Sequence, residues 1–343
     1  MTLLMARPLV QTATVVKALV VTAFVAAAGN SAAQVSAYPQ TYLAAPYNWV
    51  FRDRFPQVDA LFNAFDYGHA ILYETLWRRP GAQTSELDSV RFRFLTRQVL
   101  RNPPTVPLDE SAIGPNWVKL APEVAQTFEW AHLFHRQLYD IWSDDRLNAA
   151  QKDLQVARAL RYYQSRRDLA FSAKPKSMNL MEGQPYSLSF RRKFPKYNGL
   201  IWSYHWLQMT IYEALLAAHS PAERMENVTA VVARFWTLLD GASDSLPTVM
   251  PMAAAIAPRF TAKYPEAAVV FDNLHSLHDV VSDILADAAI PARGKRDAIL
   301  AAASRYRDET SSVTSMDEWR AMAEAMGIRN MGGPAPIQIP NGR

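Results

Sequence analysis

One pattern of residues occurs twice in the chain and constrains its fold more than any other feature. It consists of a Phe, an acid, two spacers, a His, two spacers and a second His, with an Asp five residues later. The first copy covers residues 128–140 and the second covers residues 271–283. Residues three apart lie on one face of an α-helix. Each copy therefore predicts a helix that presents one carboxylate and two imidazoles along a single arc.

Composition and periodicity predict an all-α protein. Only 12 glycines occur in 343 residues, and Ala/Leu/Arg-rich windows recur, which favours helices over sheets. The 22 prolines fall mostly between these windows, where they interrupt helices. We expect helices over residues 56–78, 85–101, 123–144 and 149–168, and then over 200–218, 222–239, 265–287, 293–308 and 316–326.

The predicted helices follow the same order twice, which predicts two pseudo-repeated halves at about 56–168 and 199–308. Glu74 and Glu213 are 139 positions apart, and the motif acids Glu129 and Asp272 are 143 apart. We expect one all-α domain at residues 34–330, a helical bundle in which four long helices surround a buried polar centre, and a flexible tail at 331–343. The connection at 169–198 is long for a compact domain, which predicts a functional loop or a crossover, with a solvated excursion as the alternative.

The N-terminus predicts export. Arg7 and Lys17 supply positive charge, and the apolar run at residues 18–29 is shorter than the ~20 residues that cross a bilayer. Residues 1–33 therefore predict a signal peptide, with an uncleaved anchor as the alternative. The mature protein is expected in the periplasm without a membrane span. A net charge of +4 is too small to indicate nucleic acid as a partner.

Histidines are concentrated where an apolar helix would normally exclude them. Six of the seven fall in the four long apolar windows, and His219 alone lies outside, at a helix end; the six are His69, His132, His135, His205, His275 and His278. Burying a polar group without a partner costs several kcal/mol, so these side chains predict one shared polar centre. Cysteine is absent, so a metal ion there would be held by nitrogen and oxygen ligands.

A first ligand set combines two isolated acids with the two acid-x-x-His pairs. It consists of Glu74, Glu129, His132, Glu213, Asp272 and His275. The order acid, acid-x-x-His, acid, acid-x-x-His resembles the ferritin-like di-iron carboxylate proteins over these four helices. It departs from them at Asp272, where Glu is usual, and in the extra His135 and His278. The resemblance implies two metal ions, with Fe as the first choice and Mn or Zn as alternatives, and an oxidase or oxygenase that acts with O₂ or peroxide on an unidentified small-molecule substrate.

Other arrangements of the same residues stay open. Three histidines from each half would suit a dicopper centre like that of tyrosinase and haemocyanin, with His69, His132 and His135 facing His205, His275 and His278. Two apposed histidines could instead hold a non-covalent haem, and a metal carrier or sensor would use the same ligands. Asp66 with His69 is a further acid-x-x-His pair, and Asp140 and Asp283 are candidates to orient an imidazole. The remaining alternative is a metal-free helical scaffold with a polar network in its core.

Overall fold

The computed structural model describes residues 42–337, apart from residues 80, 82–83 and 108. The chain divides into a unit of residues 1–43 and a unit of residues 44–343, and all the described helices belong to the second. The predicted signal peptide at residues 1–33 lies outside the described residues.

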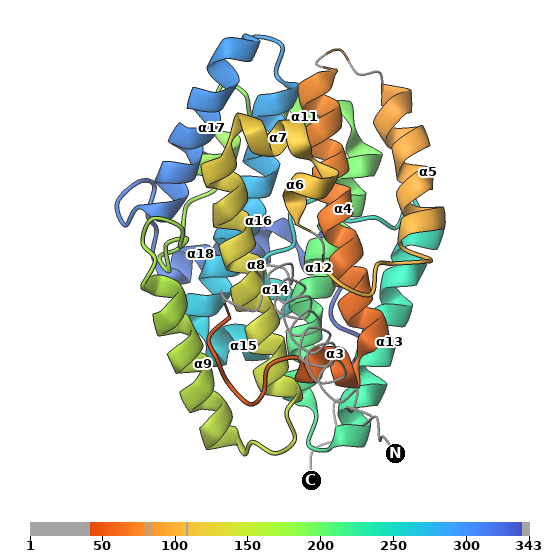
Figure 1. Cartoon of the computed structure of the whole chain (residues 1–343), viewed down its shortest axis with the longest axis vertical. Helices are drawn as coiled ribbons and strands as arrows, with labels where there is room; N and C mark the ends of the chain where they lie inside the picture. The colour runs from red at the N-terminus through yellow and green to blue at the C-terminus, as the bar shows by residue number, and fades with distance from the viewer. Residues whose placement is uncertain (1–41, 80, 82–83, 108, 338–343) are drawn as a thin grey trace, which may run out of the picture. The chain divides into compact units, whose positions relative to one another are not determined.

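Four long helices form the centre of the second unit (Figure 1). They are α4 (Pro56–Arg78), α8 (Pro122–Ser143), α12 (Pro195–Ala217) and α16 (Pro265–Ala286). Both α4 and α8 contact α12 and α16. Proline stands at the start of all four helices, where its missing N–H costs nothing and its fixed φ suits a helix. The predicted all-α fold with four long helices is confirmed, and no strand occurs within the described ranges.

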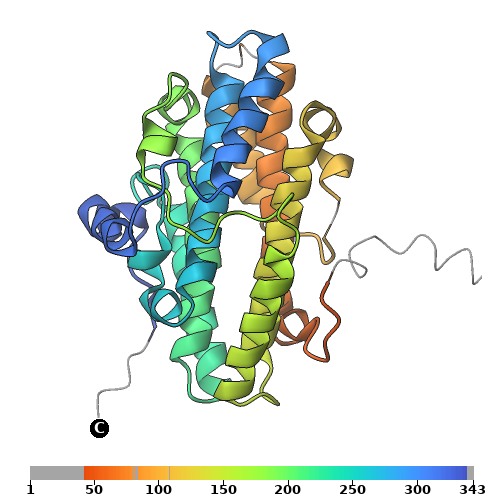
Figure 2. The same cartoon turned by 90° about the vertical axis from the view of Figure 1, so that its left-hand side faces the viewer.

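Three amphipathic helices cover the outside of this centre (Figure 2). α9 (Ala149–Gln164) packs on α8, α13 (Pro221–Asp240) on α12, and α17 (Ala292–Arg307) on α16. The shorter elements are α3 (Val50–Arg54), α6 (Glu110–Ile113), α7 (Pro115–Leu120), α10 (Asn179–Glu182), α11 (Ser189–Lys193), α14 (Ala253–Ile256), α15 (Pro258–Lys263), α18 (Met316–Met326) and the 3₁₀-helix η3 (Ile328–Met331).

The predicted α-helix at 85–101 is largely π-helical. It consists of η1 (Glu86–Arg91), α5 (Phe92–Phe94) and η2 (Leu95–Val99). Buried Leu87 and Phe92 are five positions apart, and so are Leu95 and Leu100. The N–H of the later residue bonds to the carbonyl of the earlier one in both pairs. The wider turn of a π-helix thus places both pairs on one face.

The turns that precede α4 and α12 are held by matching acids. Asp140 accepts hydrogen bonds from the N–H groups of Trp49 (3.0 Å) and Phe51 (2.8 Å). Asp283 accepts them from Leu188 (2.9 Å) and Phe190 (2.8 Å). Trp49 and Leu188 both have left-handed backbone, with φ of 73° and 67°, which is costly for bulky residues. The two carboxylates offset that cost by binding the N–H groups that this conformation turns inward.

Buried lysines match in the same way. Lys152 Nζ donates to the carbonyl of Trp142 (2.8 Å) and Lys295 Nζ to that of Leu285 (2.9 Å). The two lysines are 143 positions apart, and so are the two carbonyl residues, Trp142 and Leu285. These matched contacts support the pseudo-repeat, which stays a prediction.

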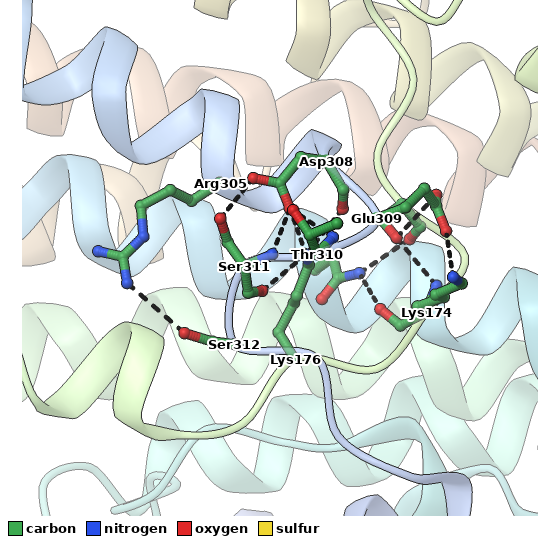
Figure 3. Close-up of polar contacts among 10 residues, drawn as sticks. Lys174, Lys176, Arg305, Asp308, Glu309, Thr310, Ser311 and Ser312 are labelled. Atoms are coloured by element: carbon green, nitrogen blue, oxygen red, sulfur yellow. Dashed lines mark hydrogen bonds and ion pairs between the residues drawn. The ribbon is translucent and has the colours of Figure 1, made fainter.

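The connection at 169–198 is ordered and carries α10 and α11. Figure 3 shows how its Lys176 meets the turn that follows α17: Nζ donates to the carbonyls of Asp308 (2.7 Å) and Ser311 (2.9 Å). Asp308 Oδ1 also accepts the N–H groups of Thr310 and Ser311, and Lys176 forms an isolated antiparallel bridge with Val313. These contacts support the crossover alternative for this connection.

The packed structure extends into the predicted tail. Met331, Gly332 and Gly333 are buried. Trp206 Nε1 donates to the Gly333 carbonyl (2.7 Å) and Arg234 Nη2 to the Gly332 carbonyl (3.0 Å). Residues 338–343 lie outside the described part of the chain. Among the described helices, none has both the length and the apolar character needed to cross a membrane.

Candidate metal centre

Three histidines converge in the middle of the bundle, one each from α4, α12 and α16. One ring nitrogen of each of His69, His205 and His278 lies within 4.8 Å of the others, and all three residues are buried. We call them the histidine triad. His69 Nε2 and His205 Nε2 are 3.4 Å apart, and two ligands on a tetrahedral ion with bonds of about 2.0–2.1 Å would be about 3.4 Å apart. The triad therefore has a spacing that a metal ion can use.

Local helix geometry sets the orientation of His69. Its Nδ1 lies 3.2 Å from the carbonyl oxygen of Phe65, one turn earlier on α4. A carbonyl oxygen only accepts, so Nδ1 carries the proton and the lone pair of Nε2 faces His205. Histidines that bind metals are commonly oriented by such a bond from the second ring nitrogen.

Burial keeps the imidazoles neutral. It lowers the pKa of His69 to about 4 and the pKa values of His205 and His278 well below the ordinary value, helped by neighbouring histidines. Neutral imidazole is the form that binds a metal. Nδ1 of His205 and Nδ1 of His278 have no hydrogen-bond partner among the described residues, although buried polar atoms nearly always have one. This shortage of partners fits a centre that binds an ion or ordered water.

The other three predicted histidines extend the cluster on both sides. His275 stacks on His205 with ring centroids 4.0 Å apart, and neither of its ring nitrogens has a partner among the described residues. Beyond it, the ring centroid of His135 is 5.9 Å away from that of His275, and Tyr212 Oη lies 2.8 Å from His135 Nδ1. At the other end of the cluster, the ring centroids of His132 and His278 are 5.6 Å apart. The structure thus brings all six predicted histidines into one cluster.

An acid-lined cavity adjoins the triad. It is lined by Asp66, His69, Glu110, Phe128, Glu129, His132 and His278. His132 Nδ1 lies 3.8 Å from Asp66 Oδ1, and Arg136 Nη2 lies 3.7 Å from Asp66 Oδ2. Burial raises the pKa of Asp66 to about 7, Arg136 opposes this rise, and the charge of Glu129 adds to it. Burial and the charge of Glu129 also raise the pKa of Glu110.

Sequence reasoning missed Glu110. It lies between the predicted helices at 85–101 and 123–144, where no helix is predicted, whereas in the structure it begins α6 after Asp109, whose carboxylate accepts from the N–H of Ser111 (2.7 Å). The Asp-Glu pair was the available signal, because Asp is a preferred residue immediately before a helix and Glu is favourable in its first turn.

Three of the predicted metal ligands accept hydrogen bonds from the backbone at the starts of short helices. Glu74 Oε2 accepts from the N–H groups of Asn116 and Trp117 at the start of α7, both at 3.1 Å. Glu213 Oε1 accepts from the N–H of Arg259 at the start of α15 (2.7 Å). A carboxylate satisfies the free N–H groups at a helix start and is favoured by the helix dipole.

The second motif acid is also engaged away from the triad. Asp272 accepts from the N–H of Ala253 (2.9 Å) and from Trp319 Nε1 (3.0 Å). We therefore leave Glu74, Glu213 and Asp272 out of the ligand set proposed here, which keeps the other predicted residues, Glu129, His132 and His275, in or beside the cluster.

Two further expectations differ from the structure. Asp140 and Asp283 bind the turns before α4 and α12 rather than an imidazole. The triad combines His69 of the first half with His205 and His278 of the second, so the histidines do not converge as one triad per half. The reason is that α4 contacts both α12 and α16, which brings ligands from both halves together. Comparisons with protein-family models, with curated proteins and with solved structures find no match to this chain.

Proposed function

We propose that the protein is a metalloprotein that binds a transition-metal ion at the histidine triad and uses it for oxidation with O₂ or peroxide. The observation that carries the proposal is the convergence of three buried, neutral imidazoles on one point. Together with the predicted signal peptide, the proposal places this chemistry in the periplasm.

The ligand type narrows the choice of ion. Imidazole suits Fe, Cu, Zn and Ni, and the chain has no cysteine to supply thiolate. The neighbouring carboxylates of Asp66 and Glu129 favour Fe over Cu, because oxygen ligands suit harder ions. Three converging nitrogens favour a bare ion over haem, since a porphyrin plane would have to separate two axial ligands.

Three protein ligands leave room for an exogenous molecule, as catalytic metal sites do. A bound redox-active ion would supply the capacity to reduce O₂ or peroxide. The chain's own residues bind and orient: the carbonyl of Phe65 fixes the His69 ring. The Phe128 ring covers His278, with ring centroids 4.2 Å apart, and excludes water from that side. Asp66 and His132 are partly exposed, with 18% and 16% of their side-chain surface accessible, so the acid-lined cavity is the part of the centre that lies nearest to solvent.

Metal content of matched variants tests the proposal. The mature chain would be loaded with Fe²⁺ and, separately, with Cu²⁺, desalted and analysed for bound metal. His205→Ala removes a triad nitrogen, and His219→Ala is the control, because His219 is exposed. We expect the wild type and His219→Ala to bind the same amount and His205→Ala to lose the triad ion.

Retention of the full metal content by a folded His205→Ala variant would contradict the proposal. Oxygen uptake by the iron-loaded protein in the presence of a reductant then tests the enzyme against a carrier or storage role, for which uptake should not exceed that of free iron. A wild-type chain that binds no metal after loading would favour the metal-free scaffold.

A further inference from the structure

We propose that the acid-lined cavity is a second cation site, in which Asp66, Glu129 and His132 bind a divalent transition-metal ion beside the triad. The inference rests on the proposed function in one respect, because the two ions would share the histidine cluster. The ligands of the second ion, however, are separate residues.

Two helices bring the candidate ligands together. Asp66 lies one turn before His69 on α4, and Glu129 lies one turn before His132 on α8, so each helix presents an acid and an imidazole on one face. The two pairs face each other across the cavity, where His132 Nδ1 is 3.8 Å from Asp66 Oδ1. That separation is too long for a hydrogen bond and is close to the spacing of two ligands on one ion.

Three acids, Asp66, Glu110 and Glu129, line the cavity. Arg136 Nη2 lies 3.7 Å from Asp66 Oδ2, and the same guanidinium donates to Asp59 (3.1 Å) and Asn63 (2.8 Å). Glu110 is oriented by Trp117 Nε1, which donates to its Oε1 at 3.0 Å. A divalent cation among these carboxylates would offset their mutual repulsion.

An unpartnered imidazole nitrogen of the cluster also belongs to a residue of the cavity wall. His278 is 2% exposed and lines the cavity, and its Nδ1 has no hydrogen-bond partner among the described residues. A mixed set of carboxylate and imidazole suits Fe²⁺, Mn²⁺ or Zn²⁺ better than Ca²⁺, which prefers oxygen ligands alone. Because His69 and His278 belong both to the triad and to the cavity wall, the two ions would be neighbours.

The corresponding acid of the second motif copy offers no such position. Both oxygens of Asp272 accept hydrogen bonds, one from the N–H of Ala253 and one from the indole of Trp319. The second site therefore belongs to the first motif copy alone.

The experiment is a titration of the metal-free mature chain with Mn²⁺, followed by electron paramagnetic resonance and by metal analysis. Glu129→Gln and Asp66→Asn each remove one ligand charge with little change of shape. Glu123→Gln is the control, because Glu123 lies on the same helix and is exposed. His205→Ala reports on the triad alone, since His205 does not line the cavity.

We expect two Mn²⁺ per wild-type chain and per Glu123→Gln chain, with a spectrum broadened by coupling between neighbouring ions. Glu129→Gln and Asp66→Asn should each weaken the second binding step by more than the 10- to 100-fold typical of residues behind the ligands, and leave a single uncoupled ion. Far-ultraviolet circular dichroism checks that the variants fold. The coupled spectrum of the wild type is a test that needs no variant.

The outcomes separate the two proposals. One ion that His205→Ala removes and Glu129→Gln leaves would overturn the second site and keep the triad. One ion that Glu129→Gln removes and His205→Ala leaves would keep the acid-lined site and overturn the triad. Two uncoupled ions in the wild type would overturn their adjacency, and a wild-type chain without bound Mn²⁺ would overturn the second site as stated.

Discussion

Asp283→Asn should destabilise the fold more than Asp140→Asn, although both acids accept hydrogen bonds from a matching pair of backbone N–H groups. Asp283 also accepts a longer one from the N–H of Arg191 (3.4 Å). Each substitution weakens two bonds of about 1 kcal/mol net. Asp283 also binds Arg191, whose Nη2 and Nε donate to Oδ2 at 2.7 and 3.0 Å, and Arg191 is only 6% exposed. Removing one partner of a buried ion pair costs about 3–5 kcal/mol. Because Arg191 keeps Glu182 as a partner, we expect the lower end of that range and therefore a difference of about 3 kcal/mol between the variants.

Urea unfolding of the mature chain, followed by circular dichroism and by tryptophan fluorescence, measures this difference; coincident transitions are needed before free energies are compared. Arg191→Met provides a second test, because Asp283→Asn should cost less in its background than in the wild type. If Asp283→Asn and Asp140→Asn lower the free energy of unfolding equally, within about 0.5 kcal/mol, the role assigned to the buried pair is wrong.

Three further predictions follow from the packing and the charges. A Cβ on Gly68 would lie 2.5 Å from Tyr204 Cε2, so Gly68→Ala should cost about 1–3 kcal/mol; an unchanged thermal unfolding curve would contradict this. Burial raises the pKa of Asp308, but hydrogen bonds from Ser311, Thr310 and Lys176 lower it by a larger amount. The net pKa is therefore below the ordinary value. Its contribution to stability is then complete above about pH 4 and is lost as the pH falls through the folded pKa. The stability difference between wild type and Asp308→Asn should accordingly shrink in acid, and a difference that grows would refute the assignment. Finally, a metal ion that binds only the native state should stabilise it by about 2.7 kcal/mol when the free metal concentration is 100 times Kd, and should therefore raise the melting temperature. Equal melting temperatures of chelated and metal-loaded samples would exclude such binding.

Much of the fold could be predicted because proline marks where the long helices begin. Pro56, Pro122 and Pro265 begin α4, α8 and α16 within one residue of the predicted starts. Hydrophobic periodicity did not reveal the π-helical turns at 86–99, because the window is short and only two buried pairs in it, Leu87–Phe92 and Leu95–Leu100, have the five-residue spacing of a π-helix.

The site was predictable only in part, and the reason is physical. A buried histidine in an apolar helix must find a partner, so the six histidines could be assigned to one centre from the sequence. A buried carboxylate must also find a partner, but that partner can be either a metal ion or the N–H groups of another helix. Glu74 and Glu213 bind the starts of α7 and α15, which lie some 40 residues further along the chain, and no local pattern reports that pairing. Glu110 reaches the cavity through a four-residue helix, too short to show periodicity.

The matched contacts bear on how such a chain can evolve. Positions that hold the frame carry the same residue in both segments, as Asp140 and Asp283 do at the turns and Lys152 and Lys295 do behind the long helices. At the centre the correspondence breaks: Asp66 lines the acid cavity, whereas His205, 139 positions later, belongs to the triad. The two ends of the centre therefore carry different donor atoms, whereas the residues of the frame match. The frame contacts and the donor atoms at the centre thus lie on different residues, so a change of donor atom leaves the matched frame contacts in place.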